Sequence, residues 1–356
     1  MMNARKANPM LRVALSVGTA GFASIVGPPA AGVIPLGNRL TVVASDFLAG
    51  GDAEYVGRWG AYTGTPISPR HFATATHIGN AGGGVFFYRN GTATETQYSV
   101  TLAGTQSDLA IYRLNDDQPS FTRWAPIYTR SNEPGKPMAV VGRGADKGSL
   151  LTVGGEPIGW FWGTQDNVFT RGTNTVDRVA TFGSPPSFAG QYLVFSFDEG
   201  QGDTEAIAAV GDSSGPVFIV DPADGVKKLA ALISAVDGGY SGTPNGPQIS
   251  GAFYDVRGLY FGPTLITGPE PIPVSAYALR LSARLQFLRQ TAGVPPLACP
   301  SDQNGDRVIN TADLTQLLSR FGQSVIPGST GDVDENGQVN TADLTALLAV
   351  FGTACP

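Results

Sequence analysis

The sequence is poor in charged residues and has no basic excess. Charged residues make up 15% of its 356 positions and the formal net charge is −6, whereas soluble proteins usually contain about 25% charged residues. A nucleic-acid-binding protein normally presents a basic face, so this composition argues against that class. After residue 36 no run is long and apolar enough to span a membrane. We therefore expect no membrane span once the N-terminal segment has been removed.

Turn-forming residues are abundant instead. The chain has 47 glycines and 26 prolines without a Gly-X-Y period, and 42% of its residues are hydrophobic, which is enough for a core. This combination favours short strands joined by tight turns over a helical bundle. The spacing of the strand-like runs favours antiparallel barrels or sandwiches; the runs are Leu40–Val43, Val85–Tyr88, Thr92–Val100, Leu109–Leu114, Met138–Val141, Tyr192–Phe197, Val217–Val220 and Leu229–Ser234. One helical pattern follows, over Ala276–Gln290.

The N-terminus has the pattern of an export signal. Arg5 and Lys6 precede an uncharged run over residues 13–36, which glycines and prolines interrupt. We expect a cleavable secretory signal over residues 1–31, with the cleavage site open and a membrane anchor as the alternative. The rest of the chain divides into a β-rich domain over 38–290, a linker over 291–298 and a final segment over 299–356.

Three short motifs together indicate an activated serine. An apolar strand ends at His77, Asp108 opens an alternating strand, and Ser213 lies in a glycine-rich turn. Acyl transfer by serine needs a base for the Oγ proton, an acid that orients this base, and N–H donors for the oxyanion. Each motif alone is compatible with ordinary loop or strand chemistry. The chain order His, Asp, Ser is that of chymotrypsin and differs from the orders in subtilisin and the α/β-hydrolases.

Residues 38–290 resemble the chymotrypsin-like (trypsin, S1) serine protease family. The segments Ala75–His77, Asp108–Ile111 and Gly211–Pro216 are similar to that family's Thr-Ala-Ala-His, Asp-Ile-Ala-Leu and Gly-Asp-Ser-Gly-Gly-Pro. The resemblance implies a mostly β fold of two six-stranded antiparallel β-barrels with a C-terminal helix. It also implies that Ser213 is the nucleophile, His77 the general base and Asp108 its orienting partner. The N–H groups of Gly211 and Ser213 would form the oxyanion hole.

The same resemblance implies a substrate pocket and shows departures from the family. Ile207 would floor the pocket for the side chain preceding the cleaved bond, Val236 would shorten it, and Ser234 lies in the strand that would line the cleft. A buried isoleucine offers no countercharge to Arg or Lys, so we expect cleavage after small or medium apolar residues. Ser214 replaces the family's glycine. In trypsin the aspartate before the serine pairs with a freshly cut chain terminus, and for Asp212 the sequence identifies no such partner.

Residues 299–356 contain a duplication. The segment that begins at Asp302 recurs thirty residues later at Asp332, and each copy continues into an apolar helical pattern. Oxygen atoms recur at loop positions 1, 3, 5, 7, 9 and 12, the spacing that surrounds Ca²⁺. One such loop could be a solvated acidic turn, but two in register favour a metal-binding role. The expected ligands are Asp302, Asn304, Asp306, the Val308 carbonyl, Asn310 and Asp313, then Asp332, Asp334, Asn336, the Gln338 carbonyl, Asn340 and Asp343.

A duplicated loop with a single following helix resembles the type I dockerin domain, a small all-α module, and this resemblance implies a cohesin-like partner. Arg307 stands where position 6 of the first loop normally has glycine, which makes that loop the weaker candidate, while Gly337 keeps the glycine in the second. Cys299 and Cys355 bracket the repeat. An even cysteine count in an exported chain predicts that they form a disulfide.

Together these features predict a serine endopeptidase, secreted or at the cell surface, that acts on a polypeptide substrate and carries a calcium-binding C-terminal module. The second hypothesis is a catalytically inactive surface or scaffold protein whose protease-like domain only binds. Two departures from the family favour this second hypothesis: Ser214 replaces a glycine, and the sequence identifies no cut chain terminus that would pair with Asp212. The intact trio of His77, Asp108 and Ser213 favours the first.

Overall fold

The computed structural model describes residues 33–38, 40–41, 55–80, 85–89, 95–165, 167–199, 202–294, 299–304, 306, 308–325, 330–334 and 336–354. The expected signal over 1–31 lies outside these residues, as do Arg307 and Cys355. We call residues 33–294 the β domain and residues 299–354 the C-terminal module.

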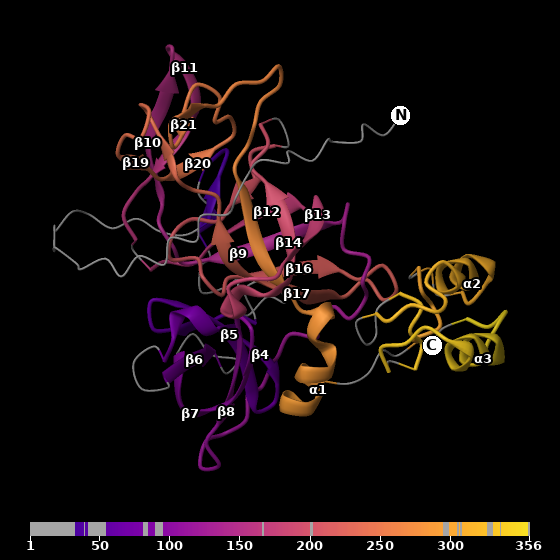
Figure 1. Ribbon diagram of the computed structural model, residues 1–356. Coiled ribbons are helices and arrows are strands. Elements are labelled where there is room, and N and C mark those ends of the chain that lie inside the picture. Colours follow the sequence, from indigo (N-terminus) through magenta and orange to yellow (C-terminus); the bar gives the residue numbers. More distant parts are fainter. Residues whose placement is uncertain are drawn as a thin grey trace.

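The N-terminal half of the β domain contains a closed barrel, drawn in indigo and purple in Figure 1. Its strand order is β3-β4-β5-β8-β7-β6, and aromatic rings fill its interior. The ring centroid of Trp59 lies 5.2 Å from that of Phe72 and 4.6 Å from that of Tyr112. Two of the expected strand-like runs lie side by side, because β6 pairs antiparallel with β7. The strands are β3 (Gly57–Trp59), β4 (Tyr62–Ser68), β5 (His71–Ala75), β6 (Val85–Arg89), β7 (Glu95–Gln106) and β8 (Leu109–Leu114).

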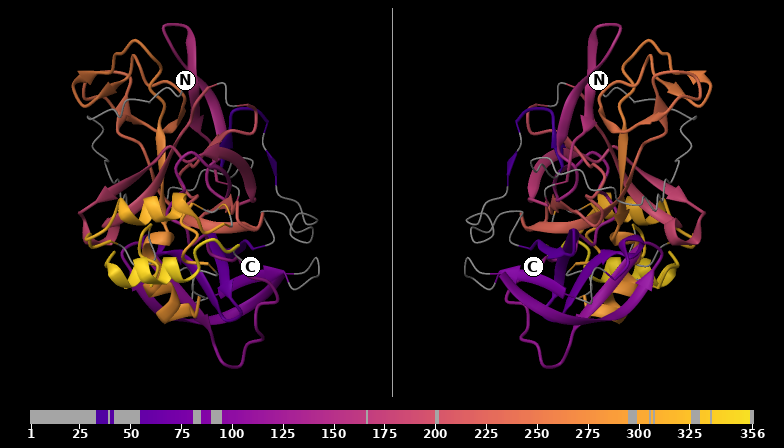
Figure 2. Two further views of the ribbon diagram at one scale, coloured as in Figure 1. Left: turned by 90° about the vertical axis from the view of Figure 1, so that its right-hand side faces the viewer. Right: turned by 90° about the vertical axis from the view of Figure 1, so that its left-hand side faces the viewer.

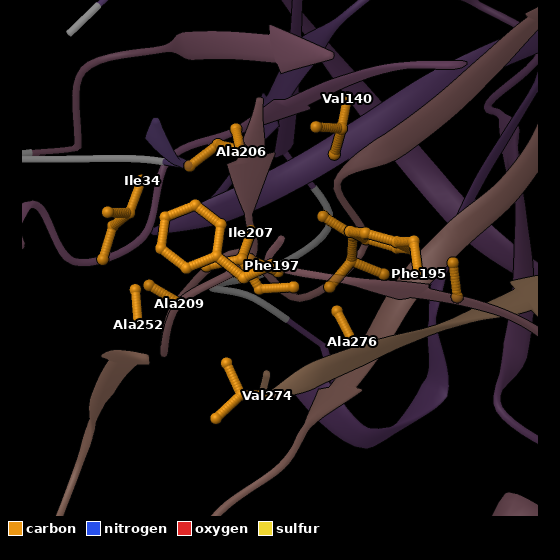
Figure 3. Packing of buried hydrophobic residues seen from close by; sticks show 14 of the residues in the cluster. Ile34, Val140, Phe195, Phe197, Ala206, Ile207, Ala209, Ala252, Val274 and Ala276 are labelled. Carbon is orange, nitrogen blue, oxygen red and sulfur yellow. The ribbon is translucent and has the colours of Figure 1, made fainter. Parts of the chain in front are cut away.

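An antiparallel eight-stranded sheet follows, in the order β13-β14-β23-β17-β16-β9-β12-β2. The sheet is open, so within the described residues only one closed barrel is present where two were expected. Its central strands are largely buried and contribute to the core shown in Figure 3. The strands are β2 (Leu40–Thr41), β9 (Pro137–Gly142), β12 (Thr170–Thr175), β13 (Arg178–Phe182), β14 (Gly190–Ser196), β16 (Pro216–Val220), β17 (Lys227–Val236) and β23 (Ser275–Arg280).

Three smaller sheets complete the β domain. One pairs β1 (Ile34–Pro35) with β15 (Ala206–Ile207), which places the buried Val33 and Ile34 in the core before the expected boundary at residue 38. The others contain β10 (Lys147–Val153), β11 (Glu156–Trp162) and β20 (Gly251–Phe253), and β18 (Tyr240–Ser241), β19 (Gln248–Ile249), β21 (Tyr260–Phe261) and β22 (Thr264–Leu265). Short 3₁₀ turns are η2 (Thr76–Ile78), η3 (Pro186–Phe188) and η4 (Ser282–Arg284).

The helix expected over Ala276–Gln290 is wrong in its first half. Residues Ser275–Arg280 form strand β23, η4 follows, and helix α1 covers Leu285–Ala292. β23 lies between β14 and β17 and is buried from Ala276 to Arg280, so both of its faces are covered. A strand buried on both faces has no two-residue hydrophobic alternation, and its pattern resembles that of a buried helix. Helix α1 also extends two residues into the expected linker, of which residues 295–298 lie outside the described chain.

The C-terminal module contains two helices related by the repeat, α2 (Thr311–Leu318) and α3 (Thr341–Ala349). Each starts with a capping box, in which the Asn310 or Asn340 side chain accepts a helix N–H and Asp313 or Asp343 accepts the N–H of that asparagine. Isolated bridges join Val308 to Ala354 and Ser324 to Gln338, so the module is not purely helical. Among the described helices of the whole chain, none is long and apolar enough to cross a membrane.

Candidate active site and metal loops

The side chains of His77, Asp108 and Ser213 meet where the barrel packs against the eight-stranded sheet, because β5 lies against β17 (Figure 1). His77 Nε2 lies 2.7 Å from Ser213 Oγ. His77 Nδ1 lies 2.9 Å from each carboxylate oxygen of Asp108. The three residues expected from their order in the chain are therefore in direct hydrogen-bonding contact.

Local structure positions the histidine and the aspartate relative to each other. His77 lies in η2 directly after β5, and Asp108 directly precedes β8, the neighbour of β5 in the barrel. The His77 N–H donates to Asp108 Oδ1 at 3.0 Å, so the carboxylate binds both the backbone and the ring of the histidine. Asp108 is only 2% exposed, whereas the His77 side chain is 32% exposed. A buried carboxylate can orient an imidazole that stays accessible to solvent.

In the part of the chain that the structure describes, the turn that carries Ser213 has unpaired N–H groups at the two residues expected to form the oxyanion hole. Within the described residues, neither the Gly211 nor the Ser213 N–H has a hydrogen-bond partner, whereas the intervening Asp212 N–H donates to Ala209 O at 3.1 Å. Gly211 has φ +91° and Ser214 has φ +67°. Two neighbouring donors left unpaired are suited to bind a developing negative charge.

Asp212 has partners that the sequence did not reveal. Its Oδ1 accepts the Gly144 N–H and its Oδ2 accepts the Ala209 N–H, both at 2.7 Å. Asp212 is completely buried, and this burial raises the pKa of its carboxyl to about 7 although the backbone donors act in the opposite direction. A Cβ at Gly142 or Gly144 would collide with the Asp212 carboxyl group. The two glycines of the segment Gly142–Gly144 were therefore the sequence signal that could have identified this segment as the partner of Asp212.

The predicted substrate-binding residues lie in three different environments. Ile207 is fully buried and pairs with Ile34 in the cluster shown in Figure 3. Val236 is partly buried and packs against the same cluster. Ser234 points to the triad instead, since its Oγ donates to Asp108 Oδ2. Sequence reasoning missed this contact between Ser234 and Asp108, because the two residues are distant in the chain.

The predicted metal ligands fall into two groups within the C-terminal module. The carboxylates of Asp302, Asp306 and Asp313 approach one another, as do those of Asp332, Asp334 and Asp343, with ligand atoms within 4.8 Å in each group. Position 12 is strongly hydrogen-bonded in both loops: Asp313 Oδ1 accepts the Gln303 N–H at 2.7 Å and Asp343 Oδ1 accepts the Val333 N–H at 2.8 Å.

The remaining predicted ligands belong to the same loops. Asn304, the Val308 carbonyl and Asn310 lie in the first, while Asn336, the Gln338 carbonyl and Asn340 lie in the second. Carboxylate, amide and carbonyl oxygens form the ligand set that hard cations such as Ca²⁺ prefer, so the residues fit this ion. The expected Cys299–Cys355 disulfide stays a prediction, because Cys355 lies outside the described residues.

Comparison with protein-family models and with curated proteins gives no match to this chain, so the functional assignment depends on the geometry described above.

Proposed function

We propose that the chain is a serine endopeptidase of the chymotrypsin-like type, in which the barrel and the open sheet correspond to the family's two barrels. The observation that carries the proposal is the continuous contact from Asp108 through His77 to Ser213, with 2.9 Å and 2.7 Å between the contacting atoms. A buried carboxylate, an accessible imidazole and a serine hydroxyl in this order form a catalytic triad, in which the acid orients the base and the base activates the nucleophile.

The proposed reaction proceeds through an acyl-enzyme. Ser213 Oγ attacks the carbonyl carbon of a peptide bond while His77 Nε2 takes its proton, and His77 then protonates the leaving amine. Asp108 stabilises the imidazolium formed in between. The unpaired N–H groups of Gly211 and Ser213 would bind the oxyanion, and hydrolysis by water would regenerate the serine.

The proposed cleavage preference is for small or medium apolar side chains. Ile207 is fully enclosed by apolar neighbours, so a charged side chain that reached it would lose its hydration without gaining a partner. Val236 would shorten the pocket that holds the side chain preceding the cleaved bond. A set of peptide substrates that differ only in the residue before the cleaved bond tests this preference, and a clear preference for Arg or Lys would contradict it.

A fluorophosphonate probe tests the catalytic assignment. The probe should label the wild-type protein at Ser213, and Ser213→Ala should abolish labelling. His77→Ala should lower the peptidase rate by several orders of magnitude, because triad members act as a unit. Ser241→Ala is a matched control, since this buried serine lies outside the triad and should leave labelling intact. A folded wild-type protein that is not labelled would instead support the inactive binding protein.

For the C-terminal module we propose calcium binding by the two loops and a dockerin-like role in anchoring or assembly, with a cohesin-like partner. The two groups of carboxylates support the first part of this proposal. Each ion would be held by the oxygen atoms of one loop and would neutralise the carboxylates that crowd there. The export pattern of residues 1–31 supports a location outside the cell or on its surface.

A further inference from the structure

Arg130 connects the β domain to the first residue of the first metal loop. Its Nη1 donates to the Asp302 carbonyl oxygen at 2.8 Å and its Nη2 donates to Asp302 Oδ2 at 3.3 Å. The two side chains are 9% and 0% exposed. The contact is therefore a buried ion pair, which is more sensitive to loss of one partner than a surface pair is.

The β domain holds Arg130 in place for this contact. Arg130 Nε donates to Asp221 Oδ1 at 3.1 Å, and Lys228 Nζ donates to Asp221 Oδ2 at 2.8 Å. Asn132, two residues further along, donates to the Asn304 carbonyl oxygen at 3.4 Å. The guanidinium thus has a fixed position beside the first loop.

The second loop also faces the β domain. Asp332 is 1% exposed, and its carboxylate attracts Arg289 of helix α1. Figures 1 and 2 show the C-terminal module, in yellow, beside α1 and the β16–β17 hairpin. The position-1 aspartate of the first loop therefore binds an arginine of the β domain, and that of the second loop lies near enough to attract one.

The position-1 aspartates also accept hydrogen bonds, and the two loops provide different donors. Asp332 accepts N–H groups of its own loop, from Asn336 at 3.0 Å and Gly337 at 2.9 Å. Asp302 binds the guanidinium of Arg130. A divalent cation bound by Asp302 would lie beside this positive charge, in a buried region where screening by salt is weak.

We propose that cation binding in the first loop and docking of the C-terminal module on the β domain oppose each other, with Arg130 as the residue that couples them. This inference rests on the proposed calcium function. Arg130 provides positive charge that a cation at Asp302 would otherwise supply, so docking lowers the cation affinity of this loop. By linkage, cation binding weakens docking by the same factor.

Calorimetric titration of the full chain with calcium chloride tests the coupling. Arg130→Gln should tighten binding at one of the two sites by about tenfold, within the usual range of coupling between sites. Arg130→Lys keeps the charge and should stay near wild type. Arg113→Gln is the matched control, because Arg113 is a surface arginine of the barrel that pairs with Asp116. Hydrogen exchange of the wild-type chain needs no variant: on the β-domain side of the contact, amides of residues 128–134 should exchange faster with calcium than with a chelator.

The possible results separate the coupling from the calcium assignment. Two calcium sites with affinities unchanged in Arg130→Gln, together with hydrogen exchange unaffected by calcium, would overturn the coupling and leave calcium binding intact. A chain that binds no calcium would overturn both. Tighter binding in Arg130→Gln with calcium-dependent exchange at the contact would support the proposal.

Discussion

Ser214 has a backbone conformation that L-amino acids rarely adopt. Its φ is +67° and its buried hydroxyl has no hydrogen-bond partner in the described part of the chain. Both features cost free energy, so Ser214→Gly should raise the free energy of unfolding by about 1–2 kcal/mol. Chemical denaturation measures this change.

Ser107 provides a matched control for that substitution. Its φ is +55°, but its hydroxyl donates to the Ala189 carbonyl oxygen at 2.5 Å. Ser107→Gly therefore relieves the backbone and loses a hydrogen bond, and it should be less stabilising than Ser214→Gly. Equal effects of the two substitutions would contradict the role assigned to the unpaired Ser214 hydroxyl.

Asp212 should make the protein less stable as the pH rises from about 4 to about 7. Burial raises its pKa from 3.8 to about 7, so in this range the folded chain keeps a proton that the unfolded chain has released. Its contribution is fully present below the unfolded pKa and is lost as the pH rises through the folded pKa, with a total of about 4 kcal/mol. Urea unfolding at several pH values measures this slope.

Asp212→Asn should remove the contribution of Asp212 to that slope. Asp237, whose pKa burial raises to about 6, acts in the same direction over a narrower range and is present in both proteins. The variant should therefore show a smaller fall in stability with rising pH, not a flat profile. If the free energy of unfolding falls equally with rising pH in the variant and the wild type, Asp212 does not cause this fall.

Some residues of the candidate site could be predicted from the sequence and others could not. His77, Asp108 and Ser213 could be predicted because each lies in a recognisable local motif whose order along the chain carries information. The Gly144 donor to Asp212 and the Ser234 donor to Asp108 come from distant segments. Only the three-dimensional packing brings these groups together.

Individual elements were predictable where they are amphipathic or repeated. Helices α2 and α3 could be predicted from the apolar helical pattern that follows each copy of the repeat, and the structure adds a capping box at Asn310 and Asn340. Strand β23 did not follow, since its surroundings, and not its own sequence, determine that both faces are buried. Whether the eight-stranded sheet closes into a barrel or stays open also depends on long-range strand pairing, which no local sequence pattern encodes.

The proposed calcium loops predict calcium-dependent stability of the C-terminal module. Without metal, carboxylates that repel one another lie close together in each loop, so a chelator should lower the melting temperature of residues 299–356 and leave that of the β domain unchanged. Asp332→Ala should lower calcium affinity more than Asp302→Ala, because Arg130 already neutralises Asp302. Calorimetric melting of the full chain with and without calcium provides the measurement. A single transition that calcium does not shift would contradict the metal assignment.

At the scale of the whole molecule, a buried ion pair joins two segments of the β domain that are far apart in the sequence. Arg280 Nε donates to Glu133 Oε1 at 2.9 Å and Arg280 Nη2 to Glu133 Oε2 at 2.6 Å, while the Ser282 hydroxyl also donates to Oε1 at 2.6 Å. Glu133 is fully buried. Glu133→Ala should therefore lower the free energy of unfolding by about 3–5 kcal/mol, because it leaves a buried arginine without its counterion.

Asp116→Ala is the matched control on the surface. Its carboxylate is 83% exposed and pairs with Arg113, so its removal should cost less than about 1 kcal/mol. Denaturant titration of both variants gives the comparison. Similar small losses for the two variants would mean that the Glu133 pair contributes no more than a surface contact.

The pairing of β1 with β15 has a consequence for the order of events during protein synthesis. Ile34 is among the first described residues to leave the ribosome, but its partner Ile207 emerges only after most of the β domain has been made. Until then Val33 and Ile34 lack the core that covers them, and long-range pairing of this kind forms slowly. A nascent or truncated chain that ends before residue 207 therefore leaves the apolar side chains of Val33 and Ile34 exposed to solvent, and these side chains become buried only when β15 has been made.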